Sequence, residues 1–245
     1  MQKKNKLAAV ISTLLLVIAL FLLFNKIVLT VGNIFFGKVA ALYNVTLSQR
    51  IYSYSAQPLF GKVEPFANYQ LSRTYFIQGK FSESIYYANR ELDFYPENCR
   101  TYYIRGLTYG YMNKIDSAIE DFETFNSTCV KDSWAGRNDL AWLYFRKGDI
   151  PKMLSTIEPM VKLYETNPWV QNSYGIALLN LGRYKEAREA FEKANIIANL
   201  MTEKEWGMAY PGNNPEIYGR GIKDMRTTIQ KNLNLAKEKL PQKTK

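Results

Sequence analysis

The middle of the chain repeats itself with a period of about 34 residues. Gly79, Gly148 and Gly182 mark equivalent positions, and Asn113 takes the slot between the first two. Repeats of this length are stacked supersecondary units, each of which buries its apolar face against its neighbours. Such an array offers an extended surface to partners and seldom encloses a catalytic pocket. Other positions keep the same step: Phe81, Ile115, Ile150 and Tyr184; Ser84, Ala118, Met153 and Ala187; Ala88, Phe122, Ile157 and Phe191.

Each repeat is interpreted as two helices, most plainly in the last repeat, where apolar residues recur at helical spacing on both sides of Gly182. A glycine there suits a helix C-cap with a positive φ. We expect Ala187 to lie where two helices cross closely, and Phe191 to fill the space beside that crossing. The recurring residues are Trp169, Tyr174, Leu178 and Leu181, followed by Tyr184, Ala187, Phe191 and Ala194.

This pattern resembles the tetratricopeptide repeat family over residues 65–199. The fourth repeat carries the resemblance best, with Gly175, Gly182, Tyr184, Ala187, Phe191 and Ala194 at family positions. The third departs most, since Met153 stands where a small residue is expected. We predict that its second helix starts at Pro151 and is kinked or irregular at Pro159. The resemblance implies an all-α fold, an α-solenoid of four helix pairs at 65–98, 99–132, 133–167 and 168–200.

The ends of the array need covers. We predict a helical segment at 30–64, a loop at 201–214, a helix at 215–240 and a disordered tail at 241–245. Asn214 suits an N-cap and Pro215 a first helical position. The helix covers the fourth repeat; a coiled coil or partner-binding helix is the alternative. Its apolar stripe is Tyr218, Ile222, Met225, Ile229, Leu233, Ala236 and Leu240.

An uncharged run from Leu7 to Phe24 precedes all of this. As a helix it would be about 27 Å long, close to the thickness of a bilayer core. We predict a transmembrane anchor at 7–29. A cleaved secretory signal is the alternative, although no small-residue cleavage site follows closely.

Basic residues set the predicted orientation of that anchor. Residues 1–6 hold Lys3, Lys4 and Lys6 and are predicted to form a cytoplasmic tip. The protein would then be a single-pass membrane protein with its repeats on the exported side, periplasmic, extracellular or lumenal.

The net charge of +10 suggests nucleic acid, but its distribution argues against that partner. Residues 65–200 hold equal numbers of basic and acidic side chains, so the excess lies in 1–64 and 201–245. A nucleic-acid groove would need a basic array. We predict no nucleic-acid partner, and contact of the basic N-terminal segment with anionic lipid headgroups.

The sequence has no histidine and two cysteines, which excludes His-based triads, most zinc sites and a four-thiolate site. Gly106 and Gly110 lack the Lys-Ser/Thr of a phosphate loop. Asp116, Glu120 and Asp121 fit a solvated helix face. We predict no enzyme, no catalytic residue, no cofactor and no metal.

Cys99 and Cys129 flank the second repeat. The start of the first helix and the end of the second lie at the same end of a helical hairpin, so the two thiols can meet. A disulfide and two free thiols both remain open.

In the resembling family, the first helix of each repeat lines a concave groove. The resemblance places aromatic, amide and arginine side chains there, suited to anchoring a peptide and to bonding its backbone. The same residues also fit inter-helix core positions. The set is Tyr69, Arg73, Phe76, Arg100, Tyr103, Tyr111, Asn138, Trp142, Phe145, Trp169, Asn172 and Asn180.

The sequence therefore predicts a membrane-anchored scaffold that holds a peptide or protein partner, in assembly or quality control of cell-envelope complexes. One alternative is an accessory subunit of a membrane enzyme such as an envelope glycosyltransferase or ligase. Another is a cytosol-facing import receptor on an organelle. The sequence names neither the partner nor the oligomeric state.

Overall fold

The structure is a computed structural model of the chain. It describes residues 2–41, 43–57, 63–130, 133–209 and 220–240. Within these ranges it contains helices and turns and no strand, which confirms the all-α prediction. The chain divides into two compact units, Met1–Asn98 and Cys99–Lys245. They are called the N-terminal and C-terminal units below.

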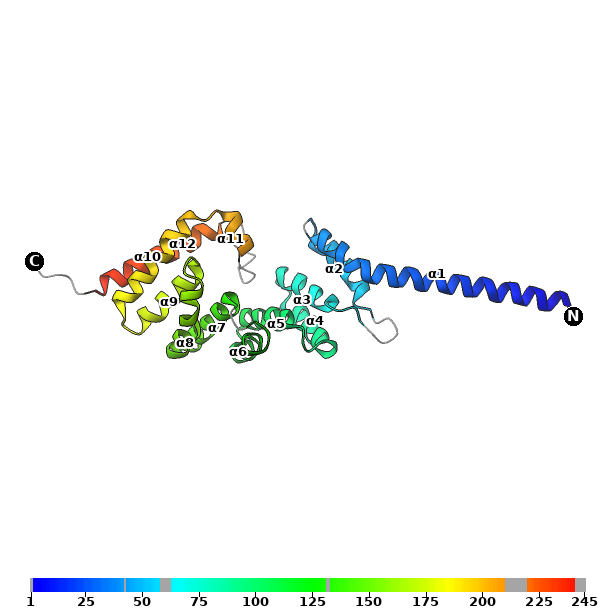
Figure 1. Ribbon diagram of the computed structural model, residues 1–245, viewed down its shortest axis with the longest axis horizontal. Helices are drawn as coiled ribbons and strands as arrows, with labels where there is room; N and C mark the ends of the chain where they lie inside the picture. Colours follow the sequence, from blue (N-terminus) through cyan, green and yellow to red (C-terminus); the bar gives the residue numbers. More distant parts are fainter. Residues whose placement is uncertain (1, 42, 58–62, 131–132, 210–219, 241–245) are drawn as a thin grey trace, which may run out of the picture. The chain divides into compact units, whose positions relative to one another are not determined.

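The N-terminal unit comprises α1 (Gln2–Ala41), α2 (Val45–Ser55), α3 (Ala67–Ile77) and α4 (Phe81–Phe94) (Figure 1). The last turns of α1 pack on α2. A Cβ atom on Gly37 would lie 2.3 Å from the buried Tyr52 ring, so only glycine fits there. Asn44 starts α2, because its side chain accepts a hydrogen bond from the backbone N–H of Leu47 at 2.9 Å.

The predicted membrane anchor is wrong. No helix in the described part of the chain is both long enough and apolar enough to cross a bilayer. The single-pass localisation and the cytoplasmic tip at residues 1–6 are wrong with it, and the envelope role that depended on them loses its basis. The uncharged run does not form a separate element: α1 continues to Ala41, where Gly37 and Ala40 are buried.

A buried carboxylate holds the start of α3. Glu91 is fully buried on α4, and it accepts hydrogen bonds from the backbone N–H groups of Phe66 at 2.7 Å and Tyr69 at 3.2 Å. The Asn98 side chain donates a third, at 2.8 Å. Burial raises the pKa of the Glu91 carboxyl, and these hydrogen bonds oppose the rise. A side chain from the next helix thus satisfies N–H groups that α3 cannot pair internally.

Replacing Glu91 with glutamine should destabilise the N-terminal unit by about 1.5–3 kcal/mol. Glutamine keeps the shape of the side chain but turns an N–H2 group toward backbone donors. Urea unfolding followed by circular dichroism measures the loss. Glu97→Gln, the same change at an exposed site, should stay within about 0.5 kcal/mol. Equal losses in the two variants would show that Glu91 does not hold α3.

The C-terminal unit begins with three helix pairs. The turns inside the pairs use left-handed backbone, as the repeat predicts: φ is 81° at Gly148 and 75° at Gly182, and Asn113 adopts 59° in the equivalent slot. Gly79 does the same in the N-terminal unit, at 70°. The helices are α5 (Cys99–Tyr111), α6 (Ile115–Thr124) with the π-helical turn η1 (Phe125–Cys129), α7 (Trp134–Lys147), α8 (Ile150–Leu163), α9 (Pro168–Asn180) and α10 (Tyr184–Leu200).

The prolines of α8 behave partly as predicted. Pro151 lies in the first turn, which follows the N-cap residue Asp149. The helix nevertheless runs through Pro159 without a break in its secondary structure. Pro159 removes the hydrogen bond to residue 155, and that residue, Ser155, is exposed, so water can satisfy its carbonyl.

A disulfide closes the first pair of this unit. Cys99, the first residue of α5, is bonded to Cys129, the last residue of η1, with their Cα atoms 5.5 Å apart. The bond therefore joins the two ends of the α5–α6 hairpin.

The region after α10 is more ordered than a loop. A short helix, α11 (Glu203–Ala209), forms within the predicted loop at 201–214, of which residues 210–214 lie outside the described residues. Thr202 and Glu205 start it as a reciprocal capping box: the backbone N–H of Thr202 donates to Glu205, and that of Glu205 to the Thr202 hydroxyl. Trp206 is buried, with its ring against Gly221.

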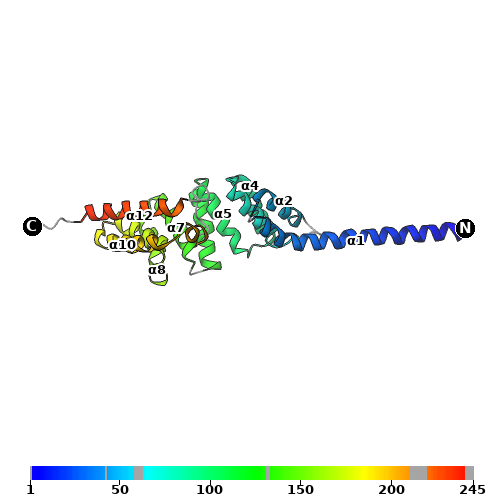
Figure 2. The ribbon, with the colours of Figure 1, turned by 90° about the horizontal axis from the view of Figure 1, so that it is seen from above.

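The C-terminal helix α12 (Gly221–Glu238) packs along α10 (Figures 1 and 2). Ile222, Ile229 and Leu233 are buried on its inner face, so the helix covers the last repeat. Glu203 accepts hydrogen bonds from the backbone N–H groups of Gly221 and Ile222, both at 3.0 Å. The predicted helix start at Asn214 and Pro215 and the predicted tail at 241–245 lie outside the described residues.

Candidate binding groove

Two cavities in the C-terminal unit meet at one side chain, Trp142 of α7. The first, about 340 Å³, lies between α5 and α7. The second, about 430 Å³, is lined from α7, α9, the start of α10 and α12. Trp142 is half-buried, and its ring meets the Phe145 ring edge-on at 5.3 Å. Because the Trp142 indole lines both cavities, one ligand that occupies both can contact it with two neighbouring groups. The two cavities together are called the Trp142 groove below.

Two glycines of α5 line the first cavity, and Gly106 faces α6 while Gly110 faces α7. A Cβ atom on Gly106 would touch the Phe122 ring at 3.0 Å, and one on Gly110 would lie 3.6 Å from Leu143. The bare backbone leaves room beside Tyr111 and Trp142. The lack of a side chain at these two glycines thus permits both the close packing of the helices and the open space of the cavity.

The charged groups of the first cavity are held by the protein itself. Asp139 accepts a hydrogen bond from the Tyr103 hydroxyl at 2.7 Å. Arg146 donates to the carbonyl of Gly110 and to the side-chain oxygen of Asn113, both at 2.8 Å. These bonds fix α7 against the hairpin before it.

The second cavity combines an apolar wall with a polar rim. Its wall is formed by Trp142, Phe145, Ile176, Leu179 and Leu235. The rim carries the amides of Asn180 and Asn232, the Thr228 hydroxyl and the Lys239 ammonium group. Few polar groups around an apolar hollow are typical of ligand sites.

The predicted groove residues of the C-terminal unit separate into three groups. Tyr111, Trp142, Phe145 and Asn180 line the groove. Tyr103 and Asn138 are buried: the Tyr103 ring meets Phe122 and Phe125, and Asn138 accepts a hydrogen bond from Ser173 at 2.6 Å. The others line neither cavity: Arg100 is exposed, Trp169 meets the Trp134 ring at 5.5 Å, and Asn172 accepts a hydrogen bond from Asn232.

The three predicted residues of the N-terminal unit also differ in exposure. Phe76 is buried and contacts the Phe81 ring. Tyr69 is half-buried, 6.3 Å from the Phe66 ring, and Arg73 is exposed. We therefore place the candidate site in the C-terminal unit, where an actual hollow accompanies the side chains.

Sequence reasoning missed the contribution of α12. Thr228, Asn232, Leu235 and Lys239 form one side of the second cavity. The signal was Leu235, an apolar residue outside the buried stripe of that helix and 41% exposed. An apolar side chain on the polar face of a covering helix marks a second contact surface.

The chemistry of the described residues offers no metal site, because no three Cys, Asp or Glu side chains gather there. The most buried ion pair beside the groove is structural: Arg105 donates two hydrogen bonds to Asp121, at 2.9 and 2.7 Å. Burial raises the pKa of the Asp121 carboxyl, and the guanidinium opposes that rise.

Comparison with known proteins supports the repeat assignment. The tetratricopeptide repeat model matches residues 100–125 and 170–195, within the α5–α6 and α9–α10 pairs. These matches confirm the second and the fourth of the four predicted tetratricopeptide repeats. The curated proteins contain no match to the sequence.

Solved structures of MamA share the fold. One, from AMB-1, has a TM-score of 0.61 at 16% identity, covering 76% of this chain and 98% of that one. A double mutant of MamA from RS-1 has a TM-score of 0.62 at 13% identity, covering 70% and 95%. At such identities the likeness is one of fold alone.

Proposed function

We propose that this chain is a non-catalytic tetratricopeptide-repeat scaffold that holds a segment of a partner protein in the Trp142 groove. The observation that carries the proposal is the meeting of two cavities at a half-buried indole. Large aromatic side chains in partly desolvated hollows dominate the energetics of protein recognition. Repeat arrays supply such hollows on rigid helices.

The groove suits a polypeptide rather than a small substrate. Its apolar wall accepts a bulky side chain. The amides of Asn180 and Asn232 each donate one hydrogen bond within the protein, to Ile176 and Asn172, and have further donor and acceptor capacity for a peptide backbone. Asp139 and Arg146 already bond within the protein, which favours binding over catalysis. The partner would therefore offer an apolar anchor flanked by extended backbone.

Trp142→Ala tests this proposal. Peptides selected from a random displayed library on the wild-type chain should lose at least about thirtyfold in affinity for the variant. Fluorescence anisotropy with the synthesised peptides measures the loss. Thermal unfolding of the variant should stay near that of the wild type, because Trp142 lines a hollow and is only half-buried.

Trp169→Ala is the matched control. Trp169 packs against Trp134 and against the core between α10 and α12, so its loss should lower stability with no selective loss of binding. If the selected peptides bound the Trp142→Ala variant with the same affinity as the wild type, the proposal that they occupy the Trp142 groove would be refuted. Unfolding of that variant would show instead that Trp142 is a core residue.

A further inference from the structure

One face of α12 lines the second cavity of the Trp142 groove with side chains of different chemistry. They are Thr228, Asn232, Leu235 and Lys239, and their spacing keeps them on one side of the helix. Lys239 caps the helix, and its backbone N–H donates to the Leu235 carbonyl at 3.2 Å. An apolar side chain and a cation therefore lie one helical turn apart on this face, which is called the α12 face below.

Lys239 is the only charged residue among the described residues that line the second cavity. Its side chain is exposed, and no acidic group in the described part of the chain forms an ion pair with it. Lys237, by contrast, pairs with Glu192 at 3.8 Å. At the start of α10, Arg183 pairs with Glu186 at 2.6 Å. The unpaired charge that the α12 face presents to this cavity is therefore positive.

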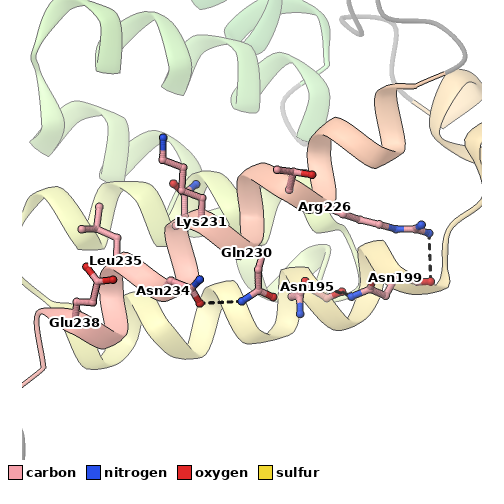
Figure 3. A pocket seen from close by; sticks show the side chains of 10 residues that line it. Asn195, Asn199, Arg226, Gln230, Lys231, Asn234, Leu235 and Glu238 are labelled. Atoms are coloured by element: carbon pink, nitrogen blue, oxygen red, sulfur yellow. Dashed lines mark hydrogen bonds between the residues drawn. The ribbon is translucent and has the colours of Figure 1, made fainter.

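The carboxylate next to Lys239 in the sequence, that of Glu238, lines a different space. Figure 3 shows the polar cleft between α10 and α12, about 750 Å³ in volume, with Leu235 and Glu238 among the side chains that line it. Leu235 lines both this cleft and the second cavity, whereas Glu238 does not line the second cavity. The acidic and the basic group at the end of α12 thus line different cavities.

Hydrogen bonds within the protein hold the α12 face in place before a ligand binds. Arg226 donates to the backbone carbonyls of Ala198 at 2.9 Å and Met201 at 2.6 Å, which ties α12 to the end of α10. The Asn232 side chain donates to that of Asn172 at 3.3 Å, which ties α12 to α9. The spacing of the side chains on this face is therefore set by the fold, and a ligand does not have to order the helix.

That spacing matches alternate side chains of an extended polypeptide. Residues four apart on a helix lie about 6 Å apart along its axis. Residues two apart on an extended chain lie about 6.6–6.8 Å apart, and their side chains point to the same face. A segment with an apolar anchor against Leu235 and Trp142 therefore brings the side chain two positions away to Lys239. The residue directly beside the anchor points away from the α12 face.

We propose that the Trp142 groove selects a partner segment with an aspartate or glutamate two positions from its apolar anchor. This inference rests on the proposed function and adds the charge of the partner to it. The carboxylate pairs with the Lys239 ammonium group, which is otherwise without an acidic neighbour in the second cavity. A lysine or arginine at the same position places like charges together at the rim and is disfavoured.

The peptides selected on the wild-type chain supply the first readout. Aspartate and glutamate should be enriched two positions from the apolar anchor and not beside it. In one such peptide, synthesised with both ends blocked, replacing the acid with lysine should weaken binding to the full chain about three- to tenfold. Moving the acid next to the anchor should weaken binding about two- to fivefold. Fluorescence anisotropy measures both changes. A requirement for a free C-terminal carboxylate would overturn the proposal.

Charge reversal on the protein gives the sharper readout. Lys239→Glu should reverse the preference, so that the lysine peptide binds more tightly than the acidic one. Lys223→Glu is the matched control, because it makes the same change at an exposed lysine of α12 that lines neither the Trp142 groove nor the polar cleft. It lies about 24 Å away along the helix and should keep the wild-type preference. Since the preference is a ratio within one variant, a loss of folded protein cannot imitate its reversal.

The failure of this inference can be distinguished from that of the proposed function. If Trp142→Ala weakens binding but Lys239→Glu keeps the wild-type preference, the partner occupies the groove and the inference about its charge is wrong. Equal changes of preference in Lys239→Glu and Lys223→Glu would assign the effect to the net charge of the chain, and the inference would again be wrong. If Trp142→Ala has no effect on binding, the proposed function and this inference both fail.

Discussion

Replacing Phe191 with alanine should lower the free energy of unfolding of the C-terminal unit by about 3–5 kcal/mol. Phe191 is fully buried on α10, and its ring rests on the backbone of α9 at Gly175. A Cβ atom on that glycine would lie only 2.6 Å from the ring. Because the opposing residue has no side chain to move into the space, the truncation leaves a cavity that the site cannot fill by collapse.

Urea unfolding followed by circular dichroism measures this loss, with Ile196→Ala as the matched control. Ile196 lies on the same helix but is 64% exposed, so its truncation should change stability by no more than about 0.5 kcal/mol. A loss below about 1 kcal/mol for Phe191→Ala would mean that the α9–α10 contact is not the packed core described above.

Removing the disulfide should be the second large effect. The bond between Cys99 and Cys129 closes a loop of 30 residues. The chain-entropy relation for such a loop gives a loss of about 3–4 kcal/mol on reduction. Since the sequence holds only these two cysteines, a reducing agent acts on this bond alone. The wild-type chain in TCEP and the Cys99→Ser, Cys129→Ser variant should show the same loss.

The location of the loss distinguishes a local from a general effect. Repeat arrays respond mainly through nearest neighbours, so hydrogen exchange should accelerate in α5 and α6 and remain slow in α9 and α10. TCEP should not change the double variant. Wild-type stability that does not respond to TCEP would show that the bond contributes nothing to folding.

Much of the fold could be predicted because the repeat fixes local geometry. A residue with φ near 75° must recur at each turn, and Gly79, Gly148 and Gly182 provide it. Ala187 and Phe191 are fully buried in the structure, at the crossing predicted for them. These inferences rest on short-range sterics, which a single sequence carries in full.

Features that depend on distant partners could not be predicted in the same way. Glu91 caps a helix that lies 25 residues earlier, at Phe66. The capping box at Thr202 and Glu205 is visible in the sequence. The apolar side chain that anchors α11, Trp206, is buried by residues of α10 and α12 that lie far from it in the chain. The anchor failed for a different reason: the absence of charge over 18 residues is not enough, since no described helix is both long and apolar enough to cross a bilayer.

The candidate site shows the limit most clearly. Trp142 and Phe145 could be assigned to a groove from their place in the repeat, but so could Tyr103 and Asn138, which are buried. Positions one turn apart on the same helix share a pattern and differ only in their neighbours. The neighbours that decide, Asn232 and Leu235, come from α12, which belongs to no repeat.

Asn113 shows what a departure from the repeat can add. Glycine would meet the backbone requirement at this turn, with φ of 59°, but it could offer no side chain to Arg146. The side-chain oxygen of Asn113 accepts a hydrogen bond from the Arg146 guanidinium, which belongs to the following hairpin and lies 33 residues later in the chain. This hydrogen bond therefore connects the α5–α6 hairpin to the α7–α8 hairpin. It restrains the orientation of α7 from the neighbouring turn, and that orientation sets the width of the cavity beside Trp142.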